Sequence, residues 1–412
     1  MKAVIFLNTT ESGTCREILK SAKRLGYKVI LFTDIMKQFL ESEKYNEVDM
    51  LIYIEYITYD EIKPYILRYI IDDYEIEGIF SFIDGYVSVA SKLADEFSNN
   101  VLNTKAIEIM EDKFKTRMLF KEESFTPNFS TLMEERDRPS LKFPLIFKES
   151  ISSASKGVKR INSRDELTNF VTSEAFLEEY IPGKQYLIEL LVKKGIPYVI
   201  AKIEQKISQT DFNTFIIKGY SLNKNFKLNM LEINMINKIV SKLDVQNGHF
   251  HIEYRKNKNG VKLIEINPRM SGSGMFALLE EALGINYTDE MLRFYLGEDI
   301  TIPKIKKNCY AHYFLSNKQG VLSKVTGKLK TINTENINRV YIKPKAGQQI
   351  RTSESMADRY GYIIGTGISA KEAKMNTLAA SKKIKFHILK NTYINLVLFV
   401  LLVIVLSLYF RN

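Results

Sequence analysis

The chain has 412 residues, 45% of them hydrophobic and 26% charged, which is ordinary for a globular protein large enough to form two or three domains. Its two cysteines, Cys15 and Cys309, stand far apart, which excludes a cysteine metal or redox motif and favours a reducing cytosolic setting. The net charge of +11 is uneven, because residues 301–412 hold 19 Lys and Arg against 4 Asp and Glu, a balance of +15 that leaves −4 for residues 1–300.

The first hundred residues alternate apolar runs with amphipathic stretches. The opening run is too short for a signal peptide, so we expect a buried strand over residues 3–8 and no export by that route. An apolar stripe at helical spacing over residues 14–25, ended by Gly26, predicts a helix packed on a sheet. Further strands are expected over residues 27–34, 49–56 and 78–84, with a helix near residues 62–71. This alternation predicts a parallel sheet with helical crossovers.

The loop after the first strand has the sequence NTTESG over residues 8–13. It lacks the G-x-G-x-x-G pattern of dinucleotide sites, so a dinucleotide cofactor is not supported. The ends of parallel strands are favoured places for ligands, so this loop either contacts substrate or is a solvated connection.

A helical pattern and a serine-rich loop follow the first hundred residues. Residues 103–122 predict a helix on which Lys113 and Arg117 share a face; alone, such a pair is most simply solvated surface. Residues 143–161 predict a strand carrying Lys148, a loop of small residues and a return strand. Small residues let backbone N–H groups approach anionic oxygens, so this segment suits phosphate, with a serine-rich hairpin turn as the alternative.

The next elements are two strands over residues 175–192 joined through Pro182 and Gly183, whose backbone could receive the edge of a base. A helix is expected over residues 229–243, before a hairpin within residues 250–274, and two apolar helices are expected over residues 275–296.

The hairpin gathers polar side chains on one face. Glu265, Asn267 and Arg269 alternate along one strand and so project together, and Glu253 lies on the preceding strand. Two carboxylates and an amide oxygen are hard ligands that suit magnesium bound to nucleotide phosphates. The alternative is an amphipathic hairpin with a solvated charged face.

Two histidines share the face of Glu253. His249 and His251 could border the site, although strand histidines more often belong to a core, and their H-x-H spacing makes no zinc site without further ligands.

In this order, the segments of residues 100–300 resemble the ATP-grasp superfamily, and the first hundred residues resemble the domain that commonly precedes it. Five motifs match in register: an aspartate-lysine helix, a second ATP lysine, a phosphate loop, an adenine hinge, and a metal pair with an arginine. The matching residues are Asp112 and Lys113; Lys148; Ser152 to Val158; Glu178, Glu179, Ile181 and Gly183; and Glu253, Glu265, Asn267 and Arg269.

The resemblance implies a role for each matching position. Arg269 and Lys148 would be catalytic: Arg269 would steady the transferred phosphoryl group or the substrate carboxylate, and Lys148, with Lys113, would hold the ATP phosphates. The residues that would bind ATP are Lys113, Lys148, Ser152, Ser153, Ser155, Gly157, Val158, Glu178, Glu179, Ile181 and Gln185. The residues that would bind Mg²⁺, or Mn²⁺ in its place, are Glu253, Glu265 and Asn267. The sequence departs from the family at Ala154, where many relatives have glycine, and at Gln185, where a ribose-binding glutamate is common.

Within the superfamily, the motif order resembles carboxylate-amine ligases of the amino-acid ligase and biotin-carboxylase-like group (EC 6.3). Such an enzyme would activate a small-molecule carboxylate as an acyl phosphate, join it to an amine, and release ADP and phosphate. Two alternatives stay open: ATP-grasp chemistry with another nucleophile, such as bicarbonate activation or purine-type ligation, and a non-catalytic ATP-binding scaffold at a membrane.

The implied fold is α/β and α+β, in four parts. These are a Rossmann-like pre-ATP-grasp domain (residues 1–102), a two-lobed ATP-grasp domain (103–300), a small basic α+β domain (301–390) and a single transmembrane helix (391–412).

The C-terminal segment is judged from hydropathy alone. Residues 393–410 carry no charge, and 18 residues at about 1.5 Å each just span a bilayer core, with a buried core helix as the alternative. Lys382, Lys383, Lys385 and Lys390 precede this segment as a cytoplasmic flank would. We therefore expect a single-pass anchor in the cell membrane with the main domains in the cytoplasm, and no nucleic-acid partner. A homo-oligomer is an open alternative to a monomer.

Overall fold

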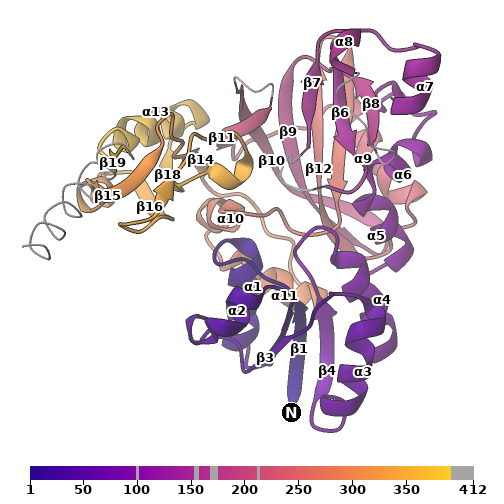
Figure 1. Ribbon diagram of the computed structural model, residues 1–412, viewed down its shortest axis with the longest axis vertical. Coiled ribbons are helices and arrows are strands. Elements are labelled where there is room, and N and C mark those ends of the chain that lie inside the picture. The colour runs from indigo at the N-terminus through magenta and orange to yellow at the C-terminus, as the bar shows by residue number, and fades with distance from the viewer. Residues whose placement is uncertain (99–101, 153–156, 168–174, 211–213, 391–412) are drawn as a thin grey trace, which may run out of the picture. The chain divides into compact units, whose positions relative to one another are not determined.

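The computed structural model describes residues 1–98, 102–152, 157–167, 175–210 and 214–390 (Figure 1). The chain divides into two compact units. The first comprises Met1–Gln205 and Leu222–Lys307, and the second comprises Lys206–Ser221 and the described residues from Asn308 onward. The predicted division after residue 300 lies close to the start of the second unit, whereas the predicted division after residue 102 falls inside the first.

The N-terminal part of the first unit is a parallel sheet with strand order β3-β2-β1-β4, as predicted. Apolar strand residues such as Ile5, Ile30 and Ile79 are buried in its core, because helices cover the sheet. The strands are β1 (Lys2–Leu7), β2 (Lys28–Thr33), β3 (Met50–Tyr53) and β4 (Glu75–Phe80). The helices are α1 (Thr14–Arg24), α2 (Met36–Leu40), α3 (Tyr59–Tyr69) and α4 (Val87–Phe97), of which α2 and α4 were not expected.

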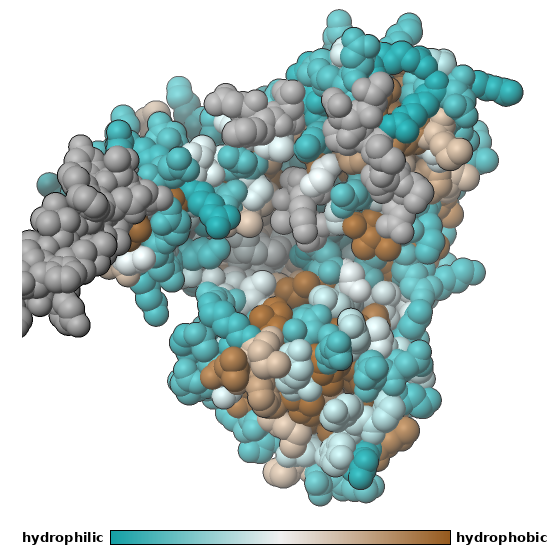
Figure 2. Space-filling model, in the orientation of Figure 1, coloured by the Kyte–Doolittle hydropathy of each residue, from teal (hydrophilic) through white to brown (hydrophobic). Residues whose placement is uncertain are grey.

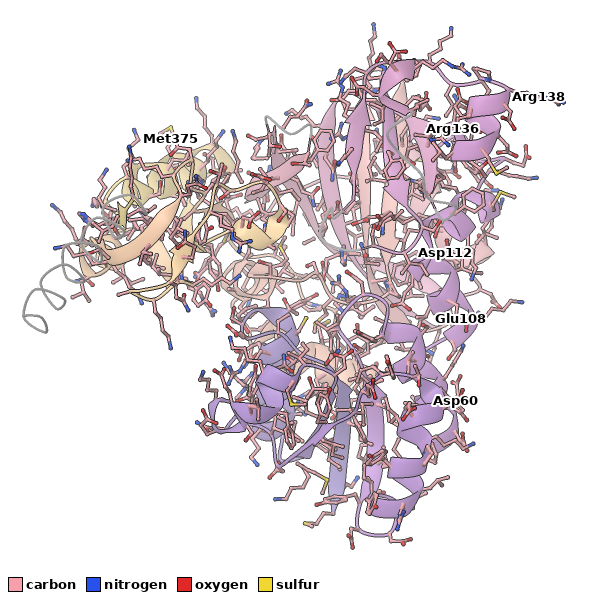
Figure 3. The ribbon with its side chains drawn as sticks, in the orientation of Figure 1. Asp60, Glu108, Asp112, Arg136, Arg138 and Met375 are labelled. Carbon is pink, nitrogen blue, oxygen red and sulfur yellow. The ribbon has the colours of Figure 1, made fainter. Side chains whose placement is uncertain are left out.

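A small antiparallel sheet follows, with strand order β5-β8-β6-β7. The helix predicted before it is two helices, because Asp112 leaves the helical conformation and its carboxylate accepts a hydrogen bond from the Lys115 backbone at 3.0 Å. Figure 3 labels Asp112 where α5 gives way to α6. The elements are α5 (Thr104–Glu111), α6 (Lys113–Leu119), β5 (Phe129–Thr131), α7 (Leu132–Asp137), β6 (Leu145–Glu149), β7 (Lys159–Ile161), α8 (Arg164–Leu167) and β8 (Ala175–Glu179).

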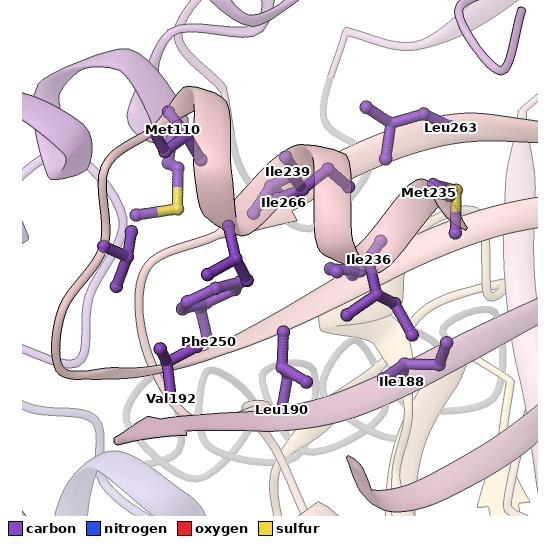
Figure 4. Close-up of a cluster of buried hydrophobic side chains, with 14 of the residues drawn as sticks. Met110, Ile188, Leu190, Val192, Met235, Ile236, Ile239, Phe250, Leu263 and Ile266 are labelled. Atoms are coloured by element: carbon purple, nitrogen blue, oxygen red, sulfur yellow. The ribbon is translucent and has the colours of Figure 1, made fainter. Parts of the chain in front are cut away.

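A larger antiparallel sheet completes the first unit, with strand order β13-β12-β9-β10. Helix α9 packs its apolar face on this sheet, as Figure 4 shows for Met235, Ile236 and Ile239 against Ile188 and Leu190. The elements are β9 (Lys184–Lys193), β10 (Ile196–Gln209), α9 (Met230–Lys242), β12 (Gly248–Asn257), β13 (Gly260–Asn267), α10 (Met275–Leu283) and α11 (Tyr287–Tyr295), and β10 ends in residues of the second unit.

The second unit is the α+β domain that was predicted. It contains strands in the order β11-β14-β18-β16 and a three-stranded sheet in the order β17-β15-β19. Phe314, Ile337, Ile363 and Ala380 form its core. The elements are β11 (Phe215–Leu222), β14 (Asn308–Tyr313), β15 (Gly320–Thr326), α12 (Lys328–Ile332), β16 (Ile337–Ile342), β17 (Gln349–Ile350), β18 (Gly361–Gly367), α13 (Ala370–Ser381) and β19 (Lys385–Leu389).

None of the helices in the described ranges is long and apolar enough to cross a membrane. The expected anchor over residues 393–410 lies outside those ranges and stays a prediction.

The loop after β1 is fastened to the loop after β13. The Thr14 backbone N–H donates to the Ser273 carbonyl at 3.0 Å, and Thr14 Oγ1 donates to the Ser271 carbonyl at 2.8 Å. Gly13 has a φ of +94°, and a Cβ there would lie 2.7 Å from the Ser273 carbonyl oxygen. The loop after β1 therefore holds residues 271–273 in place, and these residues closely follow Arg269, the last residue of the predicted site.

We expect Gly13→Ala to lower the free energy of unfolding more than Gly26→Ala. Gly26 has a φ of +90° but no atom within 4 Å of a Cβ, so its substitution costs only the left-handed backbone penalty, about 1 kcal/mol. Gly13→Ala adds a clash with the Ser273 carbonyl. Urea unfolding of both variants measures the difference, and equal losses would show that the two loops do not depend on this contact.

Candidate active site

Two carboxylates face each other at the centre of the site. The antiparallel register of β12 and β13 places Glu253 directly opposite Glu265, and His251 opposite Asn267. Directly opposed residues share one face of a sheet, with Cβ atoms about 5 Å apart. Asn267 Nδ2 also donates to Glu265 Oε1 at 3.2 Å. The structure therefore brings the three predicted metal ligands together.

Each carboxylate is held by different partners. Glu253 accepts hydrogen bonds at both oxygens, from Gln185 Nε2 at 2.9 Å and Gln205 Nε2 at 2.7 Å. Burial and the charge of Glu265 raise the pKa of Glu253 to about 8. Burial also disfavours the charged form of Glu265, but the charges of Lys113 and Lys148 outweigh it and lower the pKa of that carboxyl.

A divalent ion fits this pair. Two carboxylates that cannot both ionise freely are relieved by a cation, and the side chain of Asn267, which contacts Glu265 through Nδ2, carries an amide oxygen as a further ligand. The described ranges contain no group of three or more His, Cys, Asp or Glu that could hold a metal. An ion bound here would therefore complete its shell with other oxygens, as magnesium does with phosphates.

Two lysines contact carboxylates of the site, Lys113 that of Glu265 and Lys148 that of Glu178. Lys113 Nζ, at the start of α6, lies 3.8 Å from Glu265 Oε2 and donates to the Ser152 carbonyl. Lys148, on β6, is 4% exposed, and its Nζ contacts the carboxylate of Glu178. Burial lowers the pKa of the Lys148 ammonium, although Glu178 opposes this.

Arg117 is fully buried beside these lysines, so the alternative of a solvated basic surface is wrong. Its Nε donates to Glu178 Oε2 at 2.9 Å, and its NH2 donates to the Ile264 carbonyl at 2.7 Å. Helix α6 packs against β13, which turns this side chain inward. Burial disfavours the Glu178 carboxylate, but Arg117 and Lys148 outweigh it and lower its pKa.

Arg269 is engaged by a residue that the sequence analysis missed. Its Nε and NH2 donate to the two oxygens of Asp84 at 2.7 and 2.6 Å, and its NH1 donates to the Met270 carbonyl at 3.0 Å. Burial opposes the Asp84 charge, but Arg269 outweighs it and lowers the Asp84 pKa. The position of Asp84 after a parallel strand was the signal available in the sequence.

Comparison with known proteins decides the family. The ATP-grasp domain model matches residues 110–273, and the model of L-amino acid ligase C-terminal domain 2 matches residues 312–388. The chain belongs to the ATP-grasp superfamily and is L-amino acid ligase-like. It is an ATP-grasp ligase, an enzyme of the EC 6.3 class.

Individual relatives of this ATP-grasp chain are distant. A tyramine–L-glutamate ligase of Methanocaldococcus jannaschii is 26% identical over 70% of the chain and 90% of its own length. A formate-dependent phosphoribosylglycinamide formyltransferase of Prochlorococcus marinus is 24% identical over 93% of the chain and 97% of its own length. The crystal structure of L-amino acid ligase from Bacillus licheniformis has a TM-score of 0.79 at 20% identity, covering 95% of this chain and 99% of that one, and shows the shared fold.

The segment predicted as the adenine hinge joins the two antiparallel sheets of the first unit. Glu178 and Glu179 end β8 in the small sheet, and Gln185 lies at the start of β9 in the large one. Arg255 fixes the position of this segment through two hydrogen bonds. Its NH1 donates to the Ile181 carbonyl at 2.7 Å, and its Nε donates to Gln185 Oε1 at 3.0 Å. Gln185 is thus oriented toward Glu253, and its predicted contact with ribose stays a prediction.

The structure describes only the two ends of the predicted phosphate loop. Ser150 and Ser152 are fastened to α6 through Lys113, whose backbone N–H donates to the Ser150 carbonyl at 2.9 Å. Gly157 and Val158 lead into β7. The predicted ATP contacts Ser153 and Ser155, and the departure at Ala154, lie outside the described residues.

The two histidines differ in their surroundings. His249 is buried with Tyr287, whose hydroxyl lies 3.0 Å from His249 Nε2, and with Glu189 at 3.2 Å. It therefore belongs to a core polar cluster. His251 borders the site, since its Nδ1 lies 3.0 Å from the Arg269 carbonyl, and burial followed by the charge of Arg269 lowers its pKa.

We expect Arg117→Met to lower the free energy of unfolding by about 3–5 kcal/mol, because removing one partner leaves buried Glu178 charge less compensated. Lys115→Met, on the exposed side of the same helix, is the matched control and should change stability little. Chemical denaturation measures both, and a loss for Arg117→Met no larger than the control would contradict the assigned contact.

We expect divalent-ion binding with a nucleotide to strengthen as pH rises from 7 to about 8, since the raised pKa of Glu253 makes a proton compete with the ion. Thermal stabilisation by Mn²⁺ with a non-hydrolysable ATP analogue measures this. Glu253→Gln should weaken the stabilisation and remove its pH dependence. An unchanged pH profile in that variant would place the metal elsewhere.

Proposed function

We propose that the protein activates a small-molecule carboxylate as an acyl phosphate and joins it to an amine, releasing ADP and phosphate. The observation that carries this proposal is the opposed pair Glu253 and Glu265, with Lys113 3.8 Å from the second carboxylate and the charges of Lys113 and Lys148 both lowering its pKa. Paired carboxylates with cations beside them suit a metal-bound polyphosphate and the charge that develops during phosphoryl transfer.

The lysines bring the two anionic reactants together. A carboxylate that attacks the γ-phosphate of ATP is repelled by it, so fixed positive charge must offset that repulsion. Lys148 is buried and poorly solvated, so an arriving phosphate gains more from its charge than it would from an exposed lysine. Lys113 supplies a second ammonium group on the same side as Glu265.

Arg269 would serve the substrate side of the reaction. Asp84 holds its guanidinium through two hydrogen bonds, which fixes its plane beside Asn267. A substrate carboxylate or the transferred phosphoryl group would take over part of this pairing, because both match the arginine fork. The amine then attacks the acyl phosphate and displaces phosphate.

Glu253, Glu265 and Asn267 would hold magnesium, which when bound would neutralise phosphate charge during transfer. Manganese has similar ligand preferences and is the alternative ion.

The relatives support an amine as the nucleophile. The family model over residues 312–388 is that of L-amino acid ligases, and the tyramine–L-glutamate ligase is named for joining an amine to an amino acid. Purine-type ligation is a second candidate, favoured by the nearly full-length match to the formyltransferase. A non-catalytic scaffold is disfavoured because the opposed carboxylates and both lysines are all present.

A screen for ADP release over pairs of amino acids, other carboxylates and amines tests the proposal. The panel includes formate with phosphoribosylglycinamide, so that the second candidate is tested in the same assay. We expect ADP to form only when a carboxylate and an amine are both present. Binding of Mg-ATP without ADP formation across the panel would favour the scaffold.

We expect Glu265→Gln to reduce turnover at least about 100-fold while the protein stays folded, because one opposed carboxylate is lost. Glu290→Gln, a surface glutamate paired with Arg293 at 4.0 Å, is the control and should retain activity. Circular dichroism checks folding, and unchanged turnover in Glu265→Gln would refute the assigned site.

A further inference from the structure

The second unit carries positive charge that its own carboxylates do not balance. Residues 308–390 contain 15 Lys and Arg against 4 Asp and Glu. Across the described part of the chain, none of the lysines in this segment forms an ion pair with a carboxylate, whereas most surface lysines near the N-terminus do, such as Lys23 with Asp49 at 2.6 Å. Unpaired lysines at this density favour an anionic partner.

Part of this charge lies on the outer face of the β15–β19 pair. The antiparallel register places Lys324 opposite His387 and Thr326 opposite Lys385, and Thr326 Oγ1 lies 3.0 Å from His387 Nε2. These residues are exposed. The intervening Phe386 turns the other way, with its ring 5.7 Å from that of Phe314 in the core. One face of the pair is thus polar and basic, and the other is packed.

Two more lysines adjoin this face. Gly327, between β15 and α12, approaches the backbone before β19 so closely that a Cβ there would lie 1.9 Å from the Lys383 carbonyl oxygen. This contact places Gly327 against Lys383, and exposed Lys328 and Lys382 directly adjoin these two residues in sequence. We define the basic face as Lys324, Thr326, Lys328, Lys382, Lys385 and His387. On the side of the second unit visible in Figure 2, hydrophilic residues predominate.

The basic face lies next in sequence to the apolar run. Strand β19 ends at Leu389, which is 49% exposed and is followed by exposed Lys390. Only two residues separate Lys390 from residues 393–410, which carry no charge. An extended chain advances at most about 3.5 Å per residue, so inserting that run into a bilayer would hold Leu389 within about 14 Å of the headgroups.

We propose that the basic face docks on a membrane surface that contains anionic phospholipids. Lysines are attracted to the negative potential of such a surface, and the exposed Leu389 beside them suits the interface better than it suits a nucleic acid. The proposal does not depend on the chemistry of the ligase site, since the face belongs wholly to the second unit.

A single introduced thiol on the full chain tests the proposal, because Cys15 and Cys309 are both buried. Thr326→Cys places a thiol on the basic face, and Lys371→Cys, at the far end of α13, provides the control position. Each protein is reconstituted into vesicles of phosphatidylcholine alone or mixed with phosphatidylserine, and labelling by a water-soluble maleimide is timed. We expect phosphatidylserine to slow labelling at position 326 on the order of 100-fold, less at high salt, and to leave position 371 unchanged.

Charge neutralisation separates specific docking from general attraction. In the Thr326→Cys background, Lys324→Gln, Lys382→Gln and Lys385→Gln together should abolish the protection. Lys218→Gln, Lys318→Gln and Lys371→Gln, the same charge change at exposed positions elsewhere in the unit, should preserve it. Equal labelling rates in both vesicle types, or equal effects of the two triple variants, would overturn the proposal. Protection by duplex DNA without vesicles, and none by phosphatidylserine, would instead identify a nucleic-acid surface.

Discussion

The opposition of Glu253 and Glu265 is the constraint on which the rest of the site depends. Their strands are hydrogen-bonded in a fixed register, which holds the backbones of the two residues directly opposite each other. The two carboxylates have different neighbours. Two glutamines donate hydrogen bonds to Glu253, whose pKa is raised to about 8, while the charges of two lysines lower the pKa of Glu265. A cation between the two carboxylates would offset their repulsion, and a metal-bound nucleotide would supply one.

Buried ion pairs connect the surrounding parts to this centre. Arg117 links the small sheet, through Glu178, to the large sheet, through carbonyls of β13. Asp84, which follows β4 of the N-terminal sheet, accepts two hydrogen bonds from Arg269, which lies two residues after the end of β13. Buried pairs of this kind add little net stability but cost much to break, so they fix geometry more than they strengthen the fold. Two buried ion pairs, Arg117 with Glu178 and Arg269 with Asp84, therefore position the site.

The sequence predicted those features of the fold and site that local residue patterns determine. Alternation along β13 and the polar turn before it placed Glu253, Glu265 and Asn267 on one face, and the alternation of strands and helices predicted the parallel sheet. It missed what depends on tertiary packing. The helical pattern alone suggested that Arg117 is exposed, but packing of α6 on β13 buries it. Asp84 could not be paired with Arg269 from local pattern because 185 residues separate them. The break at Asp112 was missed because a single capping side chain decides it. The predicted ATP and metal contacts describe a bound state and stay predictions.

The most direct test of carboxylate activation follows the oxygen atoms of the substrate. With a carboxylate labelled with oxygen-18 and a partner amine that supports ADP release, an acyl phosphate intermediate requires one labelled oxygen to leave with phosphate. We therefore predict inorganic phosphate carrying one oxygen-18 per turnover, detected by mass spectrometry, and a product carbonyl that retains the other. Unlabelled phosphate, or release of AMP and pyrophosphate in place of ADP, would contradict the account.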